Sequence, residues 1–232
     1  MSAAPFTPHN PLTVTAPDTR PPHAYIAIEG PIGVGKTSLA ERLAQRWSMQ
    51  AMFERPQDNP FLERFYRDTA RYALHVQLSF ALQRAQQVQE IGALHAAGTP
   101  LVTDFMTQKN EIFARLTLKE DEWQLYHALA KRLDMPGLAP DLVLYLQASP
   151  EVLFERIQKR AVPMELQISD AYLRALCDAY NQFFYHYDGA PVLTVNTEHL
   201  NPLESNADLE LLVERIETMR GRKEFFVKGT TL

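Results

Sequence analysis

A glycine-rich segment between an apolar run and an amphipathic stretch has residue types that could do phosphate chemistry. It follows residues 24–29, leads into residues 36–47, and reads Gly30-Pro31-Ile32-Gly33-Val34-Gly35-Lys36-Thr37-Ser38. Glycines let backbone N–H groups close around phosphate oxygens, and the N-terminus of the following helix adds a partial positive charge. In this GxxxxGK[ST] pattern, Lys36 would reach the β and γ phosphates and Thr37 would offer its hydroxyl to Mg²⁺. The segment therefore predicts a nucleoside triphosphate site formed by Gly30, Gly33, Val34, Gly35, Lys36, Thr37 and Ser38.

The phosphate loop by itself does not distinguish a kinase from a switch GTPase or an ATPase. The sequence has no Asn-Lys-x-Asp segment of the kind that reads guanine in GTPases. At 232 residues it is also short for a motor or transporter ATPase with its partner surfaces. A small-molecule kinase is therefore the leading prediction.

Glu54 is the candidate group on the acceptor side of such a reaction. It ends the second apolar run, residues 51–54, and ligands of open parallel sheets bind beyond the carboxyl ends of the strands. A carboxylate at that edge could take a proton from an attacking hydroxyl. The alternative is a solvated acid at the end of a strand.

A long helical pattern places two polar side chains among apolar ones. Gln77 and Arg84 are seven residues apart, so they lie on one helix face together with Leu74, Ala81 and Val88. An amide presents a donor and an acceptor together, which suits the edge of a nucleobase. The alternative is that neighbouring carbonyl groups satisfy both side chains.

Two arginines, Arg156 and Arg160, lie one turn apart on another predicted helix, with Lys159 beside them and Glu165 just after. Cations there could stabilise the charge of a phosphoryl group in transfer, and the alternative is a solvated charged face. The histidines show neither metal-ligand spacing nor HExxH, and no Ser/His/Asp order stands out. Zinc and hydrolytic chemistry therefore have no support.

The composition is that of one globular domain, with 46% hydrophobic and 22% charged residues. No apolar run approaches the roughly 18 residues of a membrane span, and a net charge of −5 gives no basic surface for a nucleic-acid polymer. The single cysteine, Cys177, excludes a disulfide framework and favours a reducing compartment. Residues 1–23 are rich in proline and carry no targeting signal, so we expect a disordered tail, one domain over residues 24–232 and a cytoplasmic location.

Short apolar runs alternate with longer amphipathic stretches from residue 24 onward, a pattern typical of a doubly wound α/β domain. We expect a five-stranded parallel sheet with helices on both faces. The predicted strands are residues 24–29, 51–54, 101–105, 142–147 and 192–195, and the predicted helices are 36–47, 71–97, 119–133, 150–160, 168–187 and 207–220.

Several segments resemble the deoxynucleoside kinase family, in particular the bacterial deoxyguanosine and deoxyadenosine kinases. The resemblance runs from about Tyr25 to Thr197. It implies an α/β P-loop kinase fold with a short lid, Mg·ATP as the phosphate donor, a deoxynucleoside acceptor, and a homodimer formed through helices. The segments that carry it are residues 28–37, 58–62 with Phe65 and Tyr66, 112–114 and 156–160, together with the spacing from Tyr66 to Gln77 to Arg84.

The resemblance also implies roles for residues on the acceptor side. Glu54 would be the general base for the 5′-hydroxyl of the nucleoside. Tyr66 and Glu165 would hold the 3′-hydroxyl. Gln77 would pair with the base and Phe113 would stack on it.

The resemblance gives the charged residues matching roles. Arg84 would lie beside the base pocket. Arg156 and Arg160 would belong to the lid that closes over the phosphates, where they would act with Lys36 on the transferring phosphoryl group. Val162 stands where the family often has another arginine, which predicts weaker transition-state stabilisation or a different cation at that place.

The third predicted strand ends in a departure from the family pattern. Where the family has an acid, an arginine and a serine, this chain reads Thr103-Asp104-Phe105. Because side chains alternate along a strand, Asp104 either holds Mg²⁺ with Thr37 or takes the place of the arginine. An aspartate followed by an aromatic residue resembles the deoxyguanosine kinase branch.

The base preference is predicted from hydrogen-bond donors. Cytidine-preferring members of the family carry an acid near the position of Lys109, whereas a lysine can only donate. Lys109 together with Arg84 favours a carbonyl such as O6 of guanine. We therefore expect γ-phosphoryl transfer from ATP to the 5′-hydroxyl of deoxyguanosine, with deoxyadenosine next and pyrimidines behind, in nucleotide salvage. The alternatives are a nucleoside monophosphate kinase and a nucleotide-binding regulatory module with degraded catalysis.

Overall fold

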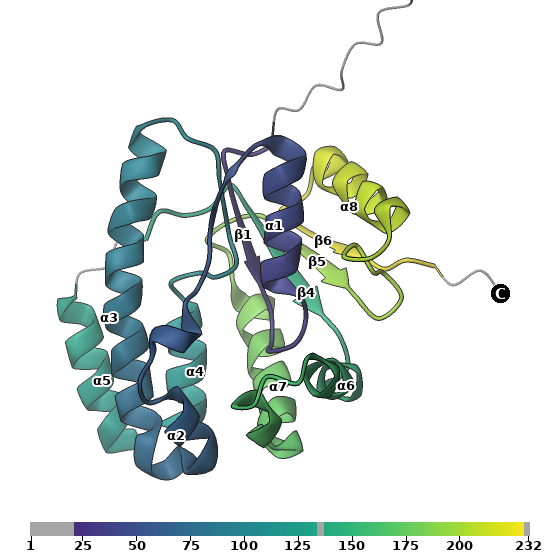
Figure 1. Cartoon of the computed structure of the whole chain (residues 1–232). Helices are drawn as coiled ribbons and strands as arrows, with labels where there is room; N and C mark the ends of the chain where they lie inside the picture. The colour runs from purple at the N-terminus through teal and green to yellow at the C-terminus, as the bar shows by residue number, and fades with distance from the viewer. Residues whose placement is uncertain (1–20, 134–136, 230–232) are drawn as a thin grey trace, which may run out of the picture.

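A parallel sheet of six strands forms the centre of the molecule, in the order β2-β3-β1-β4-β5-β6 (Figure 1). The computed structural model describes residues 21–133 and 137–229, so nearly all of the expected tail lies outside the described residues. None of the helices in the described ranges has the length and apolar character needed to span a bilayer. The strands are β1 (Tyr25–Glu29), β2 (Gln50–Met52), β3 (Leu101–Thr103), β4 (Leu142–Gln147), β5 (Val192–Asn196) and β6 (Lys223–Phe226).

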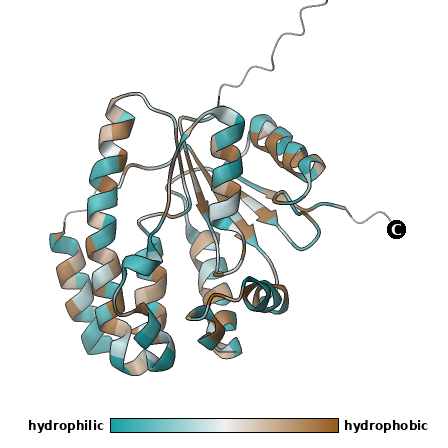
Figure 2. Ribbon diagram, in the orientation of Figure 1, coloured by the Kyte–Doolittle hydropathy of each residue, from teal (hydrophilic) through white to brown (hydrophobic). Residues whose placement is uncertain are grey.

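Helices cover both faces of the sheet because successive strand side chains point to opposite faces. Ile26 and Ile28 pack in the core beneath α1 and α8, whereas Tyr25 and Ala27 pack with residues of α3, α4 and α7. Figure 2 shows the apolar strands between helices that carry hydrophilic residues on their outer sides. The α-helices are α1 (Lys36–Trp47), α2 (Leu62–Arg67), α3 (Thr69–Ala96), α4 (Lys109–Thr117), α5 (Glu120–Arg132), α6 (Pro150–Arg160), α7 (Asp170–His186) and α8 (Asn206–Thr218).

Local capping explains where the long helices begin. Asp68 accepts a hydrogen bond from the backbone N–H of Arg71 at 3.2 Å and starts α3. Ser169 does the same for Tyr172 at 3.2 Å and starts α7. The core side of α7 also contains Cys177, which is buried.

The expected α/β architecture is confirmed, and every predicted strand and helix is present with bounds shifted by at most two residues. The sheet has one strand more than expected. The extra strand, β6, was missed because it is a short edge strand whose residues are alternately exposed and half-buried. The short helices α2 and α4 were also missed, since six and nine residues give too few turns for a clear apolar period.

The strand order brings three segments to one edge of the sheet. β1 lies between β3 and β4, and the phosphate loop follows it. Glu54 comes shortly after β2, and Asp104 comes directly after β3. All strands are parallel, so their carboxyl ends meet at this edge. The strand order reverses beside β1, and ligands of such sheets bind at the point of reversal.

Gly30, the first residue of the phosphate loop, is expected to be intolerant of a side chain. Its φ is +149°, and a Cβ would lie 2.5 Å from the carbonyl oxygen of Leu146. We expect Gly30→Ala to lower the free energy of unfolding by about 2 kcal/mol, measured by urea denaturation. Gly92 in α3 is the matched control, since a Cβ there meets nothing within 4 Å and alanine favours a helix by about 1 kcal/mol. Equal effects of the two substitutions would contradict this account.

Candidate active site

A cavity of about 370 Å³ opens beside the phosphate loop and is lined by most of the predicted site residues. A volume of this size is enough for a small-molecule ligand. Of the predicted residues, Gly30, Val34 and Arg156 do not line it. Those that do are Gly33, Gly35, Lys36, Thr37, Ser38, Glu54, Tyr66, Gln77, Arg84, Asp104, Lys109, Phe113, Arg160 and Glu165.

The phosphate loop ends where α1 begins, with Gly35 in the left-handed region at φ 101°. This turn leaves the first N–H groups of α1 directed toward the cavity edge, where an anion would be stabilised. The ammonium of Lys36 donates to the carbonyl oxygens of Gly30 at 2.8 Å and Pro31 at 3.0 Å. Burial and the neighbouring ammonium of Lys109 lower the pKa of Lys36 to about 8. The ammonium of Lys36 therefore loses its proton more easily than an exposed lysine does, unless a negatively charged group is near it.

Asp104 joins the phosphate loop to the end of β2. One carboxylate oxygen accepts from the hydroxyl of Thr37 at 2.5 Å, and the other accepts from the backbone N–H of Glu54 at 2.7 Å. The side chain is therefore directed at the residue expected to carry Mg²⁺. The sequence left open whether Asp104 corresponds to the acid or to the arginine of the family pattern. Its contact with Thr37 is the contact expected of an acid near the phosphates.

Glu54 lies between two cations, and its side chain is only 15% exposed. Its carboxylate forms ion pairs with the guanidinium of Arg84 and, at 2.5 Å, with the ammonium of Lys109. Burial alone would raise the pKa of Glu54, but Lys109 and Arg84 outweigh it and lower this pKa to about 2. Glu54 is thus a permanently charged hydrogen-bond acceptor at neutral pH.

The two ion pairs change what Arg84 and Lys109 can do. The sequence predicted both as donors to a base carbonyl. In the structure, the terminal nitrogens of Arg84 bind Glu54 and, at 3.2 Å, the carbonyl of Met106, while Lys109 binds Glu54. Both cations are therefore held at the acceptor carboxylate, an arrangement that sequence spacing could not reveal.

Tyr66 and Glu165 lie at another wall of the cavity, as their predicted shared role requires. Burial, together with nearby Tyr172 and Glu165, raises the pKa of Tyr66 well above its ordinary value, so its phenol remains a donor. Glu165 forms an ion pair with Arg160 from the end of α6. Tyr172 was not predicted, although it lines the cavity and its buried hydroxyl has no hydrogen-bond partner among the described residues.

Phe113 and Gln77 form the wall expected to hold a base. Phe113 meets the ring of Tyr180 edge to face, with 6.2 Å between the ring centroids. The amide nitrogen of Gln77 donates to the hydroxyl of Thr117 at 3.2 Å. Gln77 is only 2% exposed, so its position is fixed by packing as well as by this bond. An aromatic face with an amide at its edge can receive a flat heterocycle.

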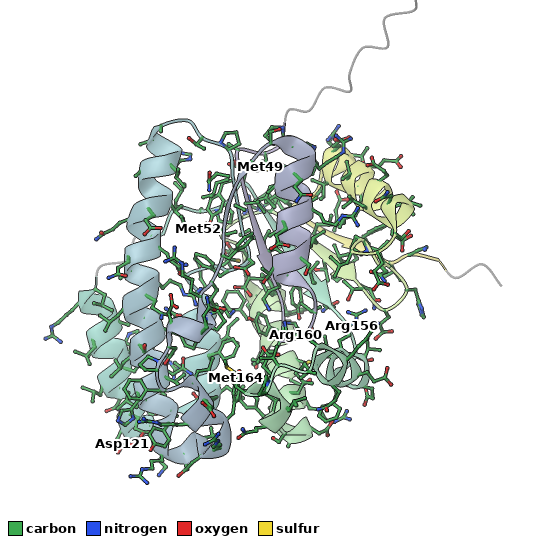
Figure 3. The ribbon with its side chains drawn as sticks, in the orientation of Figure 1. Met49, Met52, Asp121, Arg156, Arg160 and Met164 are labelled. Atoms are coloured by element: carbon green, nitrogen blue, oxygen red, sulfur yellow. The ribbon has the colours of Figure 1, made fainter. Side chains whose placement is uncertain are left out.

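The expected pair of lid arginines lies at two neighbouring cavities. Arg160 lines both the main cavity and a second cavity of about 270 Å³ beside the phosphate loop, whereas Arg156 lines only the second. Arg156 donates to the hydroxyl of Thr197 at 2.9 Å and to its carbonyl at 2.6 Å. Figure 3 labels both arginines on α6, with Arg160 on the side nearer Met164. The structure therefore brings Arg160 to the predicted site and places Arg156 beside it.

Glu29, at the end of β1, is a buried carboxylate that sequence reasoning did not select. It accepts from the backbone N–H groups of Gly30 at 3.1 Å and Met106 at 2.8 Å, and from the hydroxyl of Tyr180 at 3.0 Å. It thus fixes the start of the phosphate loop to the segment after β3 and to α7. Its signal in the sequence was an acid within an otherwise apolar strand.

A metal site made of three or more His, Cys, Asp or Glu side chains is not found in residues 21–133 and 137–229. A magnesium ion held mainly by phosphates and water needs only one or two protein oxygens. The hydroxyl of Thr37 and the carboxylate of Asp104 are two oxygen groups that could bind such an ion, and they lie at the N-terminus of α1.

The chain was compared with known protein families, sequences and structures. Residues 26–219 match the family model described as "Deoxynucleoside kinase". A deoxyguanosine kinase of Bacillus subtilis is 31% identical over 84% of this chain and 97% of its own length. A deoxyadenosine/deoxycytidine kinase of the same organism is 28% identical over 86% and 94%. The solved structure of a deoxyadenosine kinase from M. mycoides with bound dATP has a TM-score of 0.73 at 23% identity, covering 84% of this chain and all of that one.

The family match spans most of the chain, and the matched range includes the phosphate loop and every residue that lines the cavity. The structural likeness supports the same fold independently. The chain therefore belongs to the deoxynucleoside kinase family and is a kinase.

Proposed function

We propose that the enzyme transfers the γ-phosphoryl group of Mg·ATP to the 5′-hydroxyl of a purine deoxynucleoside in nucleotide salvage, with deoxyguanosine preferred and deoxyadenosine next. The observation that carries the proposal is one cavity that joins a phosphate loop to a largely enclosed carboxylate, Glu54, and to a wall formed by Phe113 and Gln77. The similarity to a deoxyguanosine kinase supports the choice of base.

At the acceptor end, Glu54 orients the 5′-hydroxyl and accepts its hydrogen bond. With a pKa of about 2, its carboxylate is a weak base, so the proton moves only as the new P–O bond forms. A loose phosphoryl-transfer transition state tolerates such late proton transfer. Arg84 and Lys109 hold the carboxylate in place and bring positive charge to the reacting oxygens.

At the donor end, the charges of ATP replace the carbonyl partners of Lys36. Its ammonium turns from Gly30 and Pro31 to the phosphates, and Arg160 at the end of α6 approaches from the lid side. Thr37 and Asp104 are the residues that would hold Mg²⁺. When bound, this ion neutralises phosphate charge and fixes the phosphate oxygens. Arg156 is proposed to act on the other side of the phosphate loop, in the second cavity.

At the sugar end, Tyr66 donates to the 3′-hydroxyl and Glu165 accepts from it. The raised pKa of Tyr66 keeps the phenol protonated, and the ion pair with Arg160 keeps Glu165 in position. The cytoplasmic location remains a prediction of the sequence, and the homodimer remains an implication of the family resemblance.

A nucleoside monophosphate kinase is less well supported by the geometry. Such an enzyme needs cations free to bind the phosphate of its acceptor. Arg84 and Lys109 are the cations nearest to Glu54, and both form ion pairs with its carboxylate. A carboxylate at that place would repel a second phosphate.

A substrate panel tests the proposed function directly. ADP formation from Mg·ATP is expected with deoxyguanosine and deoxyadenosine, and to be weaker with deoxycytidine and thymidine. Turnover only with deoxynucleoside monophosphates would favour the monophosphate kinase. ATP binding without turnover on any acceptor would favour the regulatory module.

Replacing Glu54 with glutamine tests its place at the reacting hydroxyl. We expect kcat to fall at least about 100-fold, because the acceptor for the 5′-hydroxyl proton is lost, while KM for the nucleoside changes little. Steady-state kinetics give both values. Glu63→Gln makes the same chemical change at an exposed residue paired with Arg67 and is expected to leave both values unchanged. Wild-type turnover in Glu54→Gln would exclude the assigned role.

The lowered pKa of Lys36 predicts how ATP affinity depends on pH. Below pH 8 the ammonium is charged in the free protein, and above this pH it loses its proton. Binding a triphosphate favours the charged form, so binding takes up a proton and the affinity falls by about tenfold per pH unit above pH 8. Isothermal titration calorimetry between pH 7 and pH 9.5, in buffers of different ionisation enthalpy, measures both effects.

Lys36→Arg is the control for this pH dependence, because arginine keeps its charge over the whole range. Its ATP affinity is expected to be lower but flat with pH. A wild-type affinity that does not change between pH 7 and pH 9.5 would show that Lys36 remains charged without its ligand.

A further inference from the structure

Asn110 has a buried amide nitrogen without a hydrogen-bond partner among the described residues. The residue is 6% exposed, lies in the first turn of α4 and lines the main cavity. Buried donors in native proteins are almost always paired, so an unpaired one beside a ligand cavity points to an acceptor on the ligand. Neither the sequence patterns nor the proposed roles above use this residue.

The position of Asn110 on α4 places it at one edge of a base stacked on Phe113. The two residues are three positions apart, so their side chains leave the same face of the helix. Thr117, four positions further, lies on that face at the other side of Phe113. Asn110 and Thr117 are about 10 Å apart along the helix axis, which matches a purine with a hydrogen bond at each edge.

The hydrogen bonds around Thr117 fix what Gln77 offers to a base. The hydroxyl of Thr117 donates its one proton to the carbonyl of Phe113 at 2.7 Å. The same oxygen can therefore only accept from Gln77, and the group of Gln77 that faces it is the amide nitrogen, at 3.2 Å. The carbonyl oxygen of Gln77 is left for the ligand and suits an N–H group on the Watson–Crick edge of a purine.

Two other donors near this wall are directed at Glu54. The ammonium of Lys109 binds Glu54, and the terminal nitrogens of Arg84 bind Glu54 and the carbonyl of Met106. The Nε of Arg84 has no partner among the described residues, but those two bonds hold its guanidinium over the ring of Phe105, 4.9 Å from the centroid. The amide nitrogen of Asn110 forms no hydrogen bond to Glu54 or to any other described residue, and it can donate to the far edge of the base.

We propose that Asn110 is a specificity-determining residue whose amide nitrogen donates to N7 of the purine base. Guanine and adenine both present N7 as an acceptor, whereas a pyrimidine ring has no equivalent atom. The contact would select purines over pyrimidines while Gln77 reads the opposite edge. This inference rests on the proposed function and specifies how its base is chosen.

The test uses 7-deaza-2′-deoxyguanosine and 7-deaza-2′-deoxyadenosine, in which a C–H group replaces N7. For the wild-type enzyme we expect kcat/KM on each analogue to be about tenfold lower than on its parent nucleoside, because the donor of Asn110 again lacks a partner. In Asn110→Ala the parent and the analogue are expected to react equally well. Asn110→Asp keeps the shape of the side chain, presents an acceptor to N7, and is expected to favour the analogue.

The ratio of parent to analogue separates recognition from structural support, since a merely structural role would lower both rates by the same factor. Gln108→Glu makes the same amide-to-acid change at the exposed neighbouring position and should keep the wild-type ratio. Equal use of parent and analogue by the wild-type enzyme would overturn the inference and leave the proposed function standing. Absence of turnover on both parent nucleosides would overturn the proposed function, and the inference with it.

Discussion

The arrangement of residues around Glu54 depends on its carboxylate, because this group forms ion pairs with cations from two different helices. Arg84 comes from α3 and Lys109 from α4, and each is more than nine-tenths buried. A buried cation without a partner is costly, so deleting the whole side chain would leave both cations without a partner, whereas an amide at this position would still offer them an acceptor oxygen. The ion pairs therefore fix α3 and α4 against the end of β2, and with them the wall that carries Gln77 and Phe113.

Two further carboxylates connect the phosphate loop and the start of α1 to the neighbouring strand ends. Asp104 links the hydroxyl of Thr37 to the backbone of Glu54, and Glu29 links the phosphate loop to the segment after β3 and to α7. The three acids lie at or near the ends of three neighbouring strands in a parallel sheet. Each accepts hydrogen bonds from chain segments far apart in sequence, so the phosphate loop, the end of β2 and α7 are held together at this edge of the sheet.

The sequence predicted those parts of the site whose chemistry is local. The phosphate loop is a contiguous pattern, and Glu54 follows from the position of one strand end. The ion pairs of Glu54 join residues 30 and 55 positions away, so they depend on how α3 and α4 pack, which no spacing encodes. Asn110 and Glu29 carried no pattern, because a polar residue in a short helix or at a strand end is ordinary until its burial is known. The edge strand β6 was missed for a similar reason, since its pairing depends on β5 rather than on its own apolar content.

The burial of Cys177 within α7 has a practical consequence for studying motion in this enzyme. It is the one cysteine in the sequence, and burial raises the pKa of its thiol to about 11. The thiolate is the form that attacks thiol reagents, so a buried thiol with a raised pKa reacts slowly at neutral pH. Two cysteines could be introduced at exposed positions, one near the end of α6 and one on α3. They would react with fluorescent or spin labels while Cys177 remains largely unlabelled. The distance between α6 and α3 could then be followed during turnover without first removing a native thiol.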